Sequence, residues 1–134
     1  MTAAIAQVLA IVLGLWLAGL GLMMALAPRR SLRALAAMGG SPAIHYGEMI
    51  LRIAAGVVLI AAAGVSRHPA VLTTVGGFLI VSAAVLLLLP RRWHAGYSTW
   101  WARRIPTAAV RAIGPVSIAM GALLIWTILP VRAT

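Results

Sequence analysis

The residues with the clearest capacity for chemistry are Glu48 and Arg52, in the stretch HYGEMILRIAAG. Glu48 is the only carboxylate side chain in the chain. Because the two residues are four positions apart, they share one face of a helix and can form an ion pair. A lone charge in the middle of a membrane costs at least about 2.5 kcal/mol, so pairing makes such a segment easier to insert. We therefore weigh two interpretations: a structural ion pair, or a carboxylate that binds a proton or a substrate, with Arg52 favouring the ionised carboxylate.

A second arginine, Arg111, lies in a similar setting, because VRAIGP around it resembles LRIAAG around Arg52. Two arginines at matched depths can hold a lipid phosphate or an anionic solute, since guanidinium binds phosphate through paired hydrogen bonds. Basic pockets between helices on the cytoplasmic side are known sites for lipid headgroups. Alternatively, each arginine extends its charged end towards water and only supports packing. A transporter would use Glu48, Arg52 and Arg111 along its path.

Few other residue types suited to catalysis are present. There is no cysteine and only one acidic residue, which excludes disulfides, cysteine ligands and general acid–base catalysis by two carboxylates. His45 and His94 fall on one side of the predicted membrane and His68 falls on the other, so the three do not form one site. Metal binding by His45, Glu48 and His94 is the weaker alternative. We predict a non-enzymatic protein with no catalytic residue, no metal and no cofactor.

Long apolar blocks dominate the chain, which has 134 residues, of which 63% are hydrophobic and 9% are charged. The blocks cover residues 3–27, 43–65, 70–89 and 107–129. About 20 helical residues cross a hydrocarbon core of about 30 Å. The blocks lack the alternation of barrel strands, and only helices or closed barrels satisfy the backbone inside lipid. The sequence therefore predicts an all-α integral membrane protein, residues 1–134 forming one membrane domain with four transmembrane helices.

The distribution of arginines predicts an orientation in a bacterial inner (plasma) membrane. The first and third connections are rich in arginine, whereas the second connection has only Arg67 and the C-terminal tail only Arg132. Because short loops rich in Arg stay in the cytoplasm, both termini are expected in the periplasm. The cytoplasmic arginines are Arg29, Arg30, Arg33, Arg91, Arg92, Arg103 and Arg104.

The third connection, RRWHAGYSTWWARRIP, combines aromatic and basic residues at helical spacing. They share one face of a predicted helix that lies in the interface, with its rings at headgroup level and its arginines among phosphates. The first connection, RRSLRALAAMGG, is a weaker copy. Such residues also suit nucleic acid, but in a membrane protein we expect anionic lipid and no nucleic acid. The residues on the shared face are Trp93, Tyr97, Trp100, Trp101 and Arg104.

The two halves of the chain, residues 3–66 and 67–130, are predicted to form an internal repeat. Residues 14–30 match residues 76–92 at a constant offset of 62, including PRR at the end of each segment. After a three-residue shift in the connection, Arg52 pairs with Arg111. Each half then contains two spans, which predicts two tandem helical hairpins related as a parallel repeat about an axis along the membrane normal.

These features resemble the YjeT-like family of small two-helix bacterial inner-membrane proteins, whose members have no assigned activity. The shared pattern is a span that ends in proline and basic residues, a polar stretch, and a second span that opens with arginine and small residues. The first half departs from it at Ser31, where the family has tryptophan, and at Ala55, where it has glycine. The resemblance implies a tandem duplication and carries over no catalytic residue.

We therefore expect an accessory or scaffold protein that interacts with anionic lipid, with a larger membrane complex, or with both. The alternative is a small oligomeric transporter or channel. A transporter needs a water-filled cavity that reaches Glu48 and Arg52. A scaffold is packed shut there and presents apolar surface to lipid, to partner helices or to further copies of itself.

Overall fold

The computed structural model describes residues 1–129, which form six α-helices and no strands. Four of the helices, α1, α3, α4 and α6, are long and apolar enough to cross a membrane. The prediction of an all-helical chain with four long apolar segments is confirmed. Arg132 and the predicted periplasmic C-terminus lie outside the described residues. The helices are α1 (Ala3–Leu26), α2 (Pro28–Ala37), α3 (Pro42–Ala63), α4 (Pro69–Leu88), α5 (Arg91–Arg104) and α6 (Thr107–Ile128).

Prolines and one serine set the helix boundaries. α1 ends just before Pro28, and α4 ends just before Pro90, since proline cannot continue the hydrogen-bonded backbone of a preceding helix. Ser41 caps α3, because its hydroxyl accepts a hydrogen bond from the backbone N–H of Ile44 at 3.2 Å. Pro42 then occupies the first helical position, where its missing N–H is not needed. The helical spans thus begin and end within about two residues of the predicted blocks.

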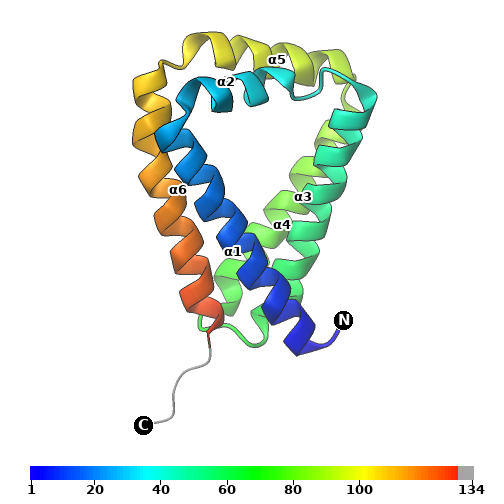
Figure 1. Ribbon diagram of the computed structural model, residues 1–134. Coiled ribbons are helices and arrows are strands. Elements are labelled where there is room, and N and C mark those ends of the chain that lie inside the picture. Colours follow the sequence, from blue (N-terminus) through cyan, green and yellow to red (C-terminus); the bar gives the residue numbers. More distant parts are fainter. Residues whose placement is uncertain (130–134) are drawn as a thin grey trace.

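The long helices form two antiparallel pairs, α1 with α6 and α3 with α4 (Figure 1). The pairs meet at the end that holds the N-terminus and separate towards the other end, where α2 and α5 lie across the bundle (Figure 1). The sequence predicts that each half forms its own hairpin, but the main pairs join one helix from each half. The reason lies in α2, whose ten residues span about 15 Å and hold α1 and α3 apart at that end.

Glycines allow the two helices of each pair to approach closely. A Cβ atom on Gly14 would lie 2.9 Å from the carbonyl oxygen of Gly121, and one on Gly21 would lie 2.5 Å from that of Gly114. In the second pair, a Cβ atom on Gly56 would lie 2.6 Å from the carbonyl oxygen of Gly76. Side chains do not fit at such distances. The pairs are therefore held by close backbone packing at small residues, as is usual between helices in membranes.

The two pairs are joined at the end of the bundle that carries the N-terminus. The backbone N–H of Arg67, in the connection between α3 and α4, donates to the carbonyl of Thr127 on α6 at 2.9 Å. At the same end, the side-chain amide of Gln7 on α1 donates to the carbonyl of Ile128 at 2.9 Å, which ties α1 to its own partner α6. A buried apolar cluster surrounds these contacts, so this end is closed. The cluster consists of Ala6, Ala10, Leu59, Ala62, Ala63, Leu72 and Ile128.

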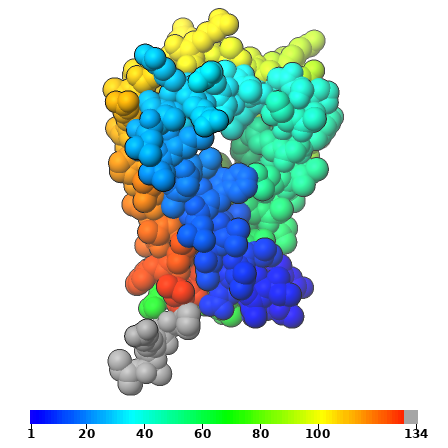
Figure 2. Space-filling view, viewed as in Figure 1, coloured from blue at the N-terminus to red at the C-terminus, as the bar shows by residue number. Residues whose placement is uncertain are grey.

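Towards the other end, the surface is open between the pairs. Figure 2 shows an opening between α1 and α3, just below α2. Large apolar side chains are exposed along the outer faces of the long helices, where no other part of the described chain covers them. Examples are Leu15, Trp16, Val57, Phe78, Val81 and Val116. These faces are suited to lipid or to the helices of another protein.

Candidate functional site

The predicted pair of Glu48 and Arg52 forms on α3. Nη2 of Arg52 donates to Oε1 of Glu48 at 2.5 Å, and the Glu48 side chain is 15% exposed against 30% for Arg52. Arg52 also reaches α4, because its Nη1 donates to the hydroxyl of Ser82 at 3.4 Å. That hydroxyl in turn donates to the carbonyl of Leu79 at 2.9 Å. The ion pair thus links α3 to α4.

Two buried histidines extend this polar chain to α5. Nδ1 of His45 on α3 lies 3.1 Å from Nδ1 of His94 on α5, a hydrogen bond in which one ring donates and the other accepts. Nε2 of His94 lies 3.6 Å from Oε2 of Glu48. His45 is 3% exposed and His94 is 7% exposed. The structure thus brings together His45, Glu48 and His94, the three residues that the sequence offers as the weaker alternative of a metal site.

Local spacing in the sequence predicts that His45 and Glu48 lie close together, but it does not predict that His94 joins them. His45 and Glu48 are three residues apart, a spacing that puts them on one face of α3. His94 lies 49 residues further along the chain than His45, and no local pattern connects it to α3. Oε2 of Glu48 is buried and has no hydrogen-bond partner among the described residues. Nε2 of His94 lies 3.6 Å from it.

The contact of α2 with α5 positions His94. Nη1 of Arg91 donates to the carbonyls of Gly39 and Gly40 at 3.0 and 2.9 Å. Gly39 has a φ of 70°, which favours glycine. A Cβ atom there would lie 2.9 Å from the backbone nitrogen of Ala95 and 3.2 Å from Nδ1 of His94. The glycine turn after α2 therefore packs directly against the start of α5.

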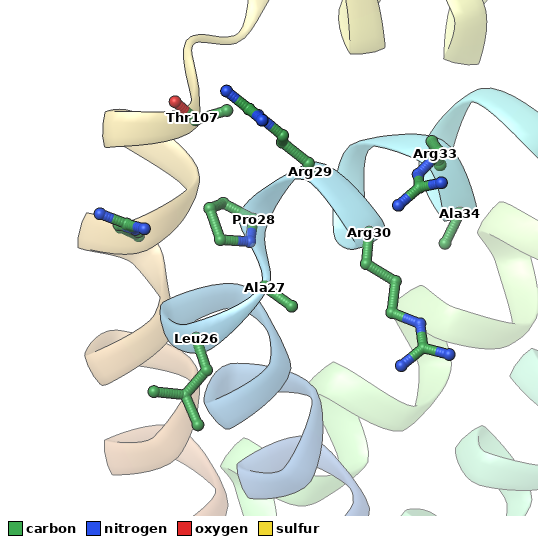
Figure 3. A pocket seen from close by; sticks show the side chains of 9 residues that line it. Leu26, Ala27, Pro28, Arg29, Arg30, Arg33, Ala34 and Thr107 are labelled. Carbon is green, nitrogen blue, oxygen red and sulfur yellow. The ribbon is translucent and has the colours of Figure 1, made fainter.

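A basic groove lies at the junction of α1, α2 and α6 (Figure 3). Its volume is about 1090 Å³. Figure 3 shows the Arg29 side chain directed towards Thr107, while Arg30 extends away from α2 along the bundle. The groove contains four arginines and no carboxylate. Its lining residues are Leu26, Ala27, Pro28, Arg29, Arg30, Arg33, Ala34, Thr107 and Arg111.

The two arginines of the predicted anion site have different surroundings. Arg111 joins the arginines of the first connection in the basic groove. Arg52 does not line this groove, because it binds Glu48 and Ser82 on the other helix pair. The repeat register that equates Arg52 with Arg111 is therefore not reflected in their contacts.

The aromatic residues predicted to lie at the interface are exposed on α5, namely Trp93, Tyr97, Trp100 and Trp101. The guanidinium of Arg104 stacks 4.0 Å from the centre of the Trp100 ring. A second groove, of about 500 Å³, lies beside this pair and includes Arg103. Arg92 is exposed at the same end and lines neither groove.

The described residues contain no group of three or more metal-ligating side chains arranged to hold a metal ion. Comparison of the chain with protein-family models, curated proteins and solved structures gave no match.

Proposed function

We propose that this protein is a non-enzymatic accessory protein of a bacterial inner membrane and that it binds anionic phospholipid in the basic groove. The observation that carries the proposal is the gathering of Arg29, Arg30, Arg33 and Arg111 around one cavity. Guanidinium groups bind phosphate through paired, charge-assisted hydrogen bonds. A phosphate group is therefore the ligand that best suits these four side chains.

The charge of the groove is not compensated within the protein. The chain has a single carboxylate side chain, Glu48, and it pairs with Arg52 outside the groove. In residues 1–129, the side-chain hydrogen bonds donated by arginine come from Arg52, Arg67 and Arg91, and none comes from the four groove arginines. An anion from outside the protein is thus needed to balance this local charge.

The apolar part of the groove favours a lipid over a soluble anion. Leu26, Ala27 and Pro28 form one wall, and Leu26 belongs to a helix long enough to span the membrane. A headgroup phosphate beside the arginines would leave its acyl chain against this helix. The exposed aromatic face of α5 supports the same position at the headgroup level, since tryptophan and tyrosine are enriched there.

The proposed orientation puts α2 and α5 at the cytoplasmic surface and both termini in the periplasm. The described arginines support it, because Arg67 alone lies in the connection at the opposite end. The anionic lipid would then come from the cytoplasmic leaflet, where clustered arginines contribute about 1 kcal/mol each to lipid binding.

We also propose that the chain arose by duplication of a two-helix unit like those of the YjeT-like family. The helix contacts support this idea. A Cβ atom on Gly14 would meet Cγ1 of Ile125 at 2.6 Å, and one on Gly76 would meet Cγ1 of Ile60 at 2.8 Å. Gly14 and Gly76 are matched by the sequence repeat. Their partners, Ile60 and Ile125, are 65 positions apart, whereas Arg52 and Arg111 are 59 positions apart. The alignment of α3 with α6 by packing is therefore shifted by six residues from the alignment that pairs the two arginines.

The alternative function, transport through Glu48, Arg52 and Arg111, has less support from the geometry. Neither of the two grooves described above is lined by Glu48 or Arg52. The exposed apolar faces of the long helices suit a scaffold that contacts lipid, a partner protein or another copy of the chain.

Native mass spectrometry of the detergent-solubilised protein tests lipid binding. We expect the protein to retain phosphatidylglycerol in preference to phosphatidylcholine. Arg111→Gln should weaken retention by about 10- to 150-fold, because the loss of one charge-assisted contact to phosphate costs about 1.5–3 kcal/mol. Arg92→Gln is the matched control, since it removes one charge at the same end but outside the groove. Equal losses in the two variants would show that net charge, and not the groove, retains the lipid.

A further inference from the structure

The cluster of His45, His94 and Glu48 is separate from the basic groove and has no role in the proposed lipid binding. It joins α3 to α5 through the histidine contact of 3.1 Å and the approach of 3.6 Å between His94 and Glu48. Both imidazole rings are buried, and Oε2 of Glu48 lacks a hydrogen-bond partner in residues 1–129. In a hydrogen bond between two imidazole nitrogens, one nitrogen must carry the hydrogen and the other must accept it.

The geometry assigns the proton on each ring. An ionised carboxylate only accepts hydrogen bonds, and a neutral imidazole has one N–H donor and one acceptor nitrogen. We place hydrogen on Nε2 of His94, which faces Oε2 of Glu48 across 3.6 Å, so that Nδ1 of His94 accepts. Nδ1 of His45 must then donate to it. Nε2 of His45 is left as the acceptor at the end of the chain.

We propose that His45, His94 and Glu48 form a proton-binding site in which a proton added to His45 is relayed through His94 to Glu48. The proton binds Nε2 of His45, and the proton on Nδ1 of His45 passes to Nδ1 of His94. The proton on Nε2 of His94 then passes to Oε2 of Glu48. One proton enters, each ring changes tautomer and remains neutral, and Glu48 becomes a carboxylic acid.

Protonation of Glu48 changes the contact between α3 and α4. The pair of Glu48 and Arg52 has no net charge, but with a neutral Glu48 the guanidinium loses its counter-ion. Its remaining contact is with Ser82 on α4, at 3.4 Å. The relay therefore connects a proton taken up where α5 contacts α3 with the ion pair that links α3 to α4.

The other titratable and charged side chains around the site are few. The ring of Tyr46 lies 5.3 Å from that of His45, measured between ring centres. Arg91 binds the carbonyls of Gly39 and Gly40 where α2 meets α5. The arginines of α2 line the basic groove. From α4, the polar side chain that reaches the site is Ser82. Within the described chain, Glu48 is thus the acidic group available to the histidines.

Nitrogen NMR of the unmodified protein, labelled with ¹⁵N-histidine, tests the proton assignment. The chain has three histidines, and His68→Gln removes the one at the opposite end of the bundle. At alkaline pH we expect His45 with hydrogen on Nδ1, His94 with hydrogen on Nε2, and a coupling through the hydrogen bond between their Nδ1 atoms. Two histidines of the same tautomer, or no such coupling, would overturn the proposal.

Infrared difference spectra then test the transfer to Glu48. We expect a carboxylic acid band to appear on acidification and to be absent from Glu48→Gln. In His94→Gln, the pH at which the band is half-formed should shift by about one unit or more, which corresponds to about a tenfold change in proton affinity. His68→Gln should leave the band unchanged. A band that titrates at the same pH in wild type and His94→Gln, or that is absent down to pH 4, would show that protonation of Glu48 is not coupled to His94 and would overturn the proposal. Neither experiment depends on lipid binding.

Discussion

Gly56 on α3 and Gly76 on α4 face each other so closely that a Cβ atom on either would lie 2.6 Å from the carbonyl oxygen of the other. The reciprocal contact explains why α3 and α4 are a packed pair. It lies between the polar cluster at one end of the bundle and the buried apolar cluster at the other. Substitutions can therefore test the glycine packing and the ion pair separately.

The glycine contacts predict a large difference between two alanine substitutions in α1. Gly21→Ala places a methyl group 2.5 Å from the carbonyl oxygen of Gly114, so the helices must move apart. Gly19→Ala meets no atom within 4 Å. We expect Gly21→Ala to lower the free energy of unfolding by about 1–3 kcal/mol, whereas Gly19→Ala leaves it unchanged or raises it by up to about 1 kcal/mol. Thermal unfolding in detergent, followed by circular dichroism, measures both. Equal melting temperatures would contradict the packing of α1 on α6.

The ion pair on α3 predicts that one substitution is more harmful than two. Glu48→Gln leaves the charge of Arg52 without a counter-ion and should lower stability by about 1–2 kcal/mol, a value reduced by the partial exposure of Arg52. The double variant Glu48→Gln with Arg52→Gln removes both charges and should recover part of that loss. Chemical unfolding of the single and double variants gives the coupling energy. Additive effects of the two substitutions would mean that the pair does not contribute as a unit.

The bonds from Arg91 predict that it anchors α5 to the turn after α2. Arg91→Gln removes two hydrogen bonds to carbonyls and should broaden the distribution of distances between α2 and α5. Arg92→Gln, the control, should leave that distribution unchanged. The chain has no cysteine, so spin labels at two introduced cysteines report this distance without background. Pairs at Ala34 and Gly96 suit the measurement by electron paramagnetic resonance. Unchanged distance distributions in Arg91→Gln would show that packing alone holds the two helices together.

The proposed orientation predicts opposite labelling at the two ends of the bundle. A cysteine at Val65, in the connection between α3 and α4, should react with an impermeant maleimide added outside the inner membrane. A cysteine at Arg92 should react only after permeabilisation. Both positions are exposed, so neither requires unfolding. Labelling of Arg92→Cys in intact spheroplasts, with none at Val65→Cys, would reverse the orientation and place the basic groove in the periplasm.

The sequence by itself determined the four long apolar helices, their ends at prolines, and the ion pair of Glu48 with Arg52. These features depend on neighbouring residues: hydropathy over about 20 positions, the missing N–H of proline, and the spacing of four residues along one helix. The predicted interface residues on α5 are exposed for the same reason, because a helix presents residues at spacings of three and four on one side.

Only the tertiary structure decided which helices pair and which polar groups meet. Apolar helices in lipid gain little from hydrophobicity when they choose a partner, so packing at small residues decides, and α1 pairs with α6 where Gly14 meets Gly121. That choice brings Arg111 to the groove and gives Arg52 its contact with Ser82 on α4. The contact of His45 with His94 arises in the same way, because it depends on how α5 crosses the bundle and not on any local pattern.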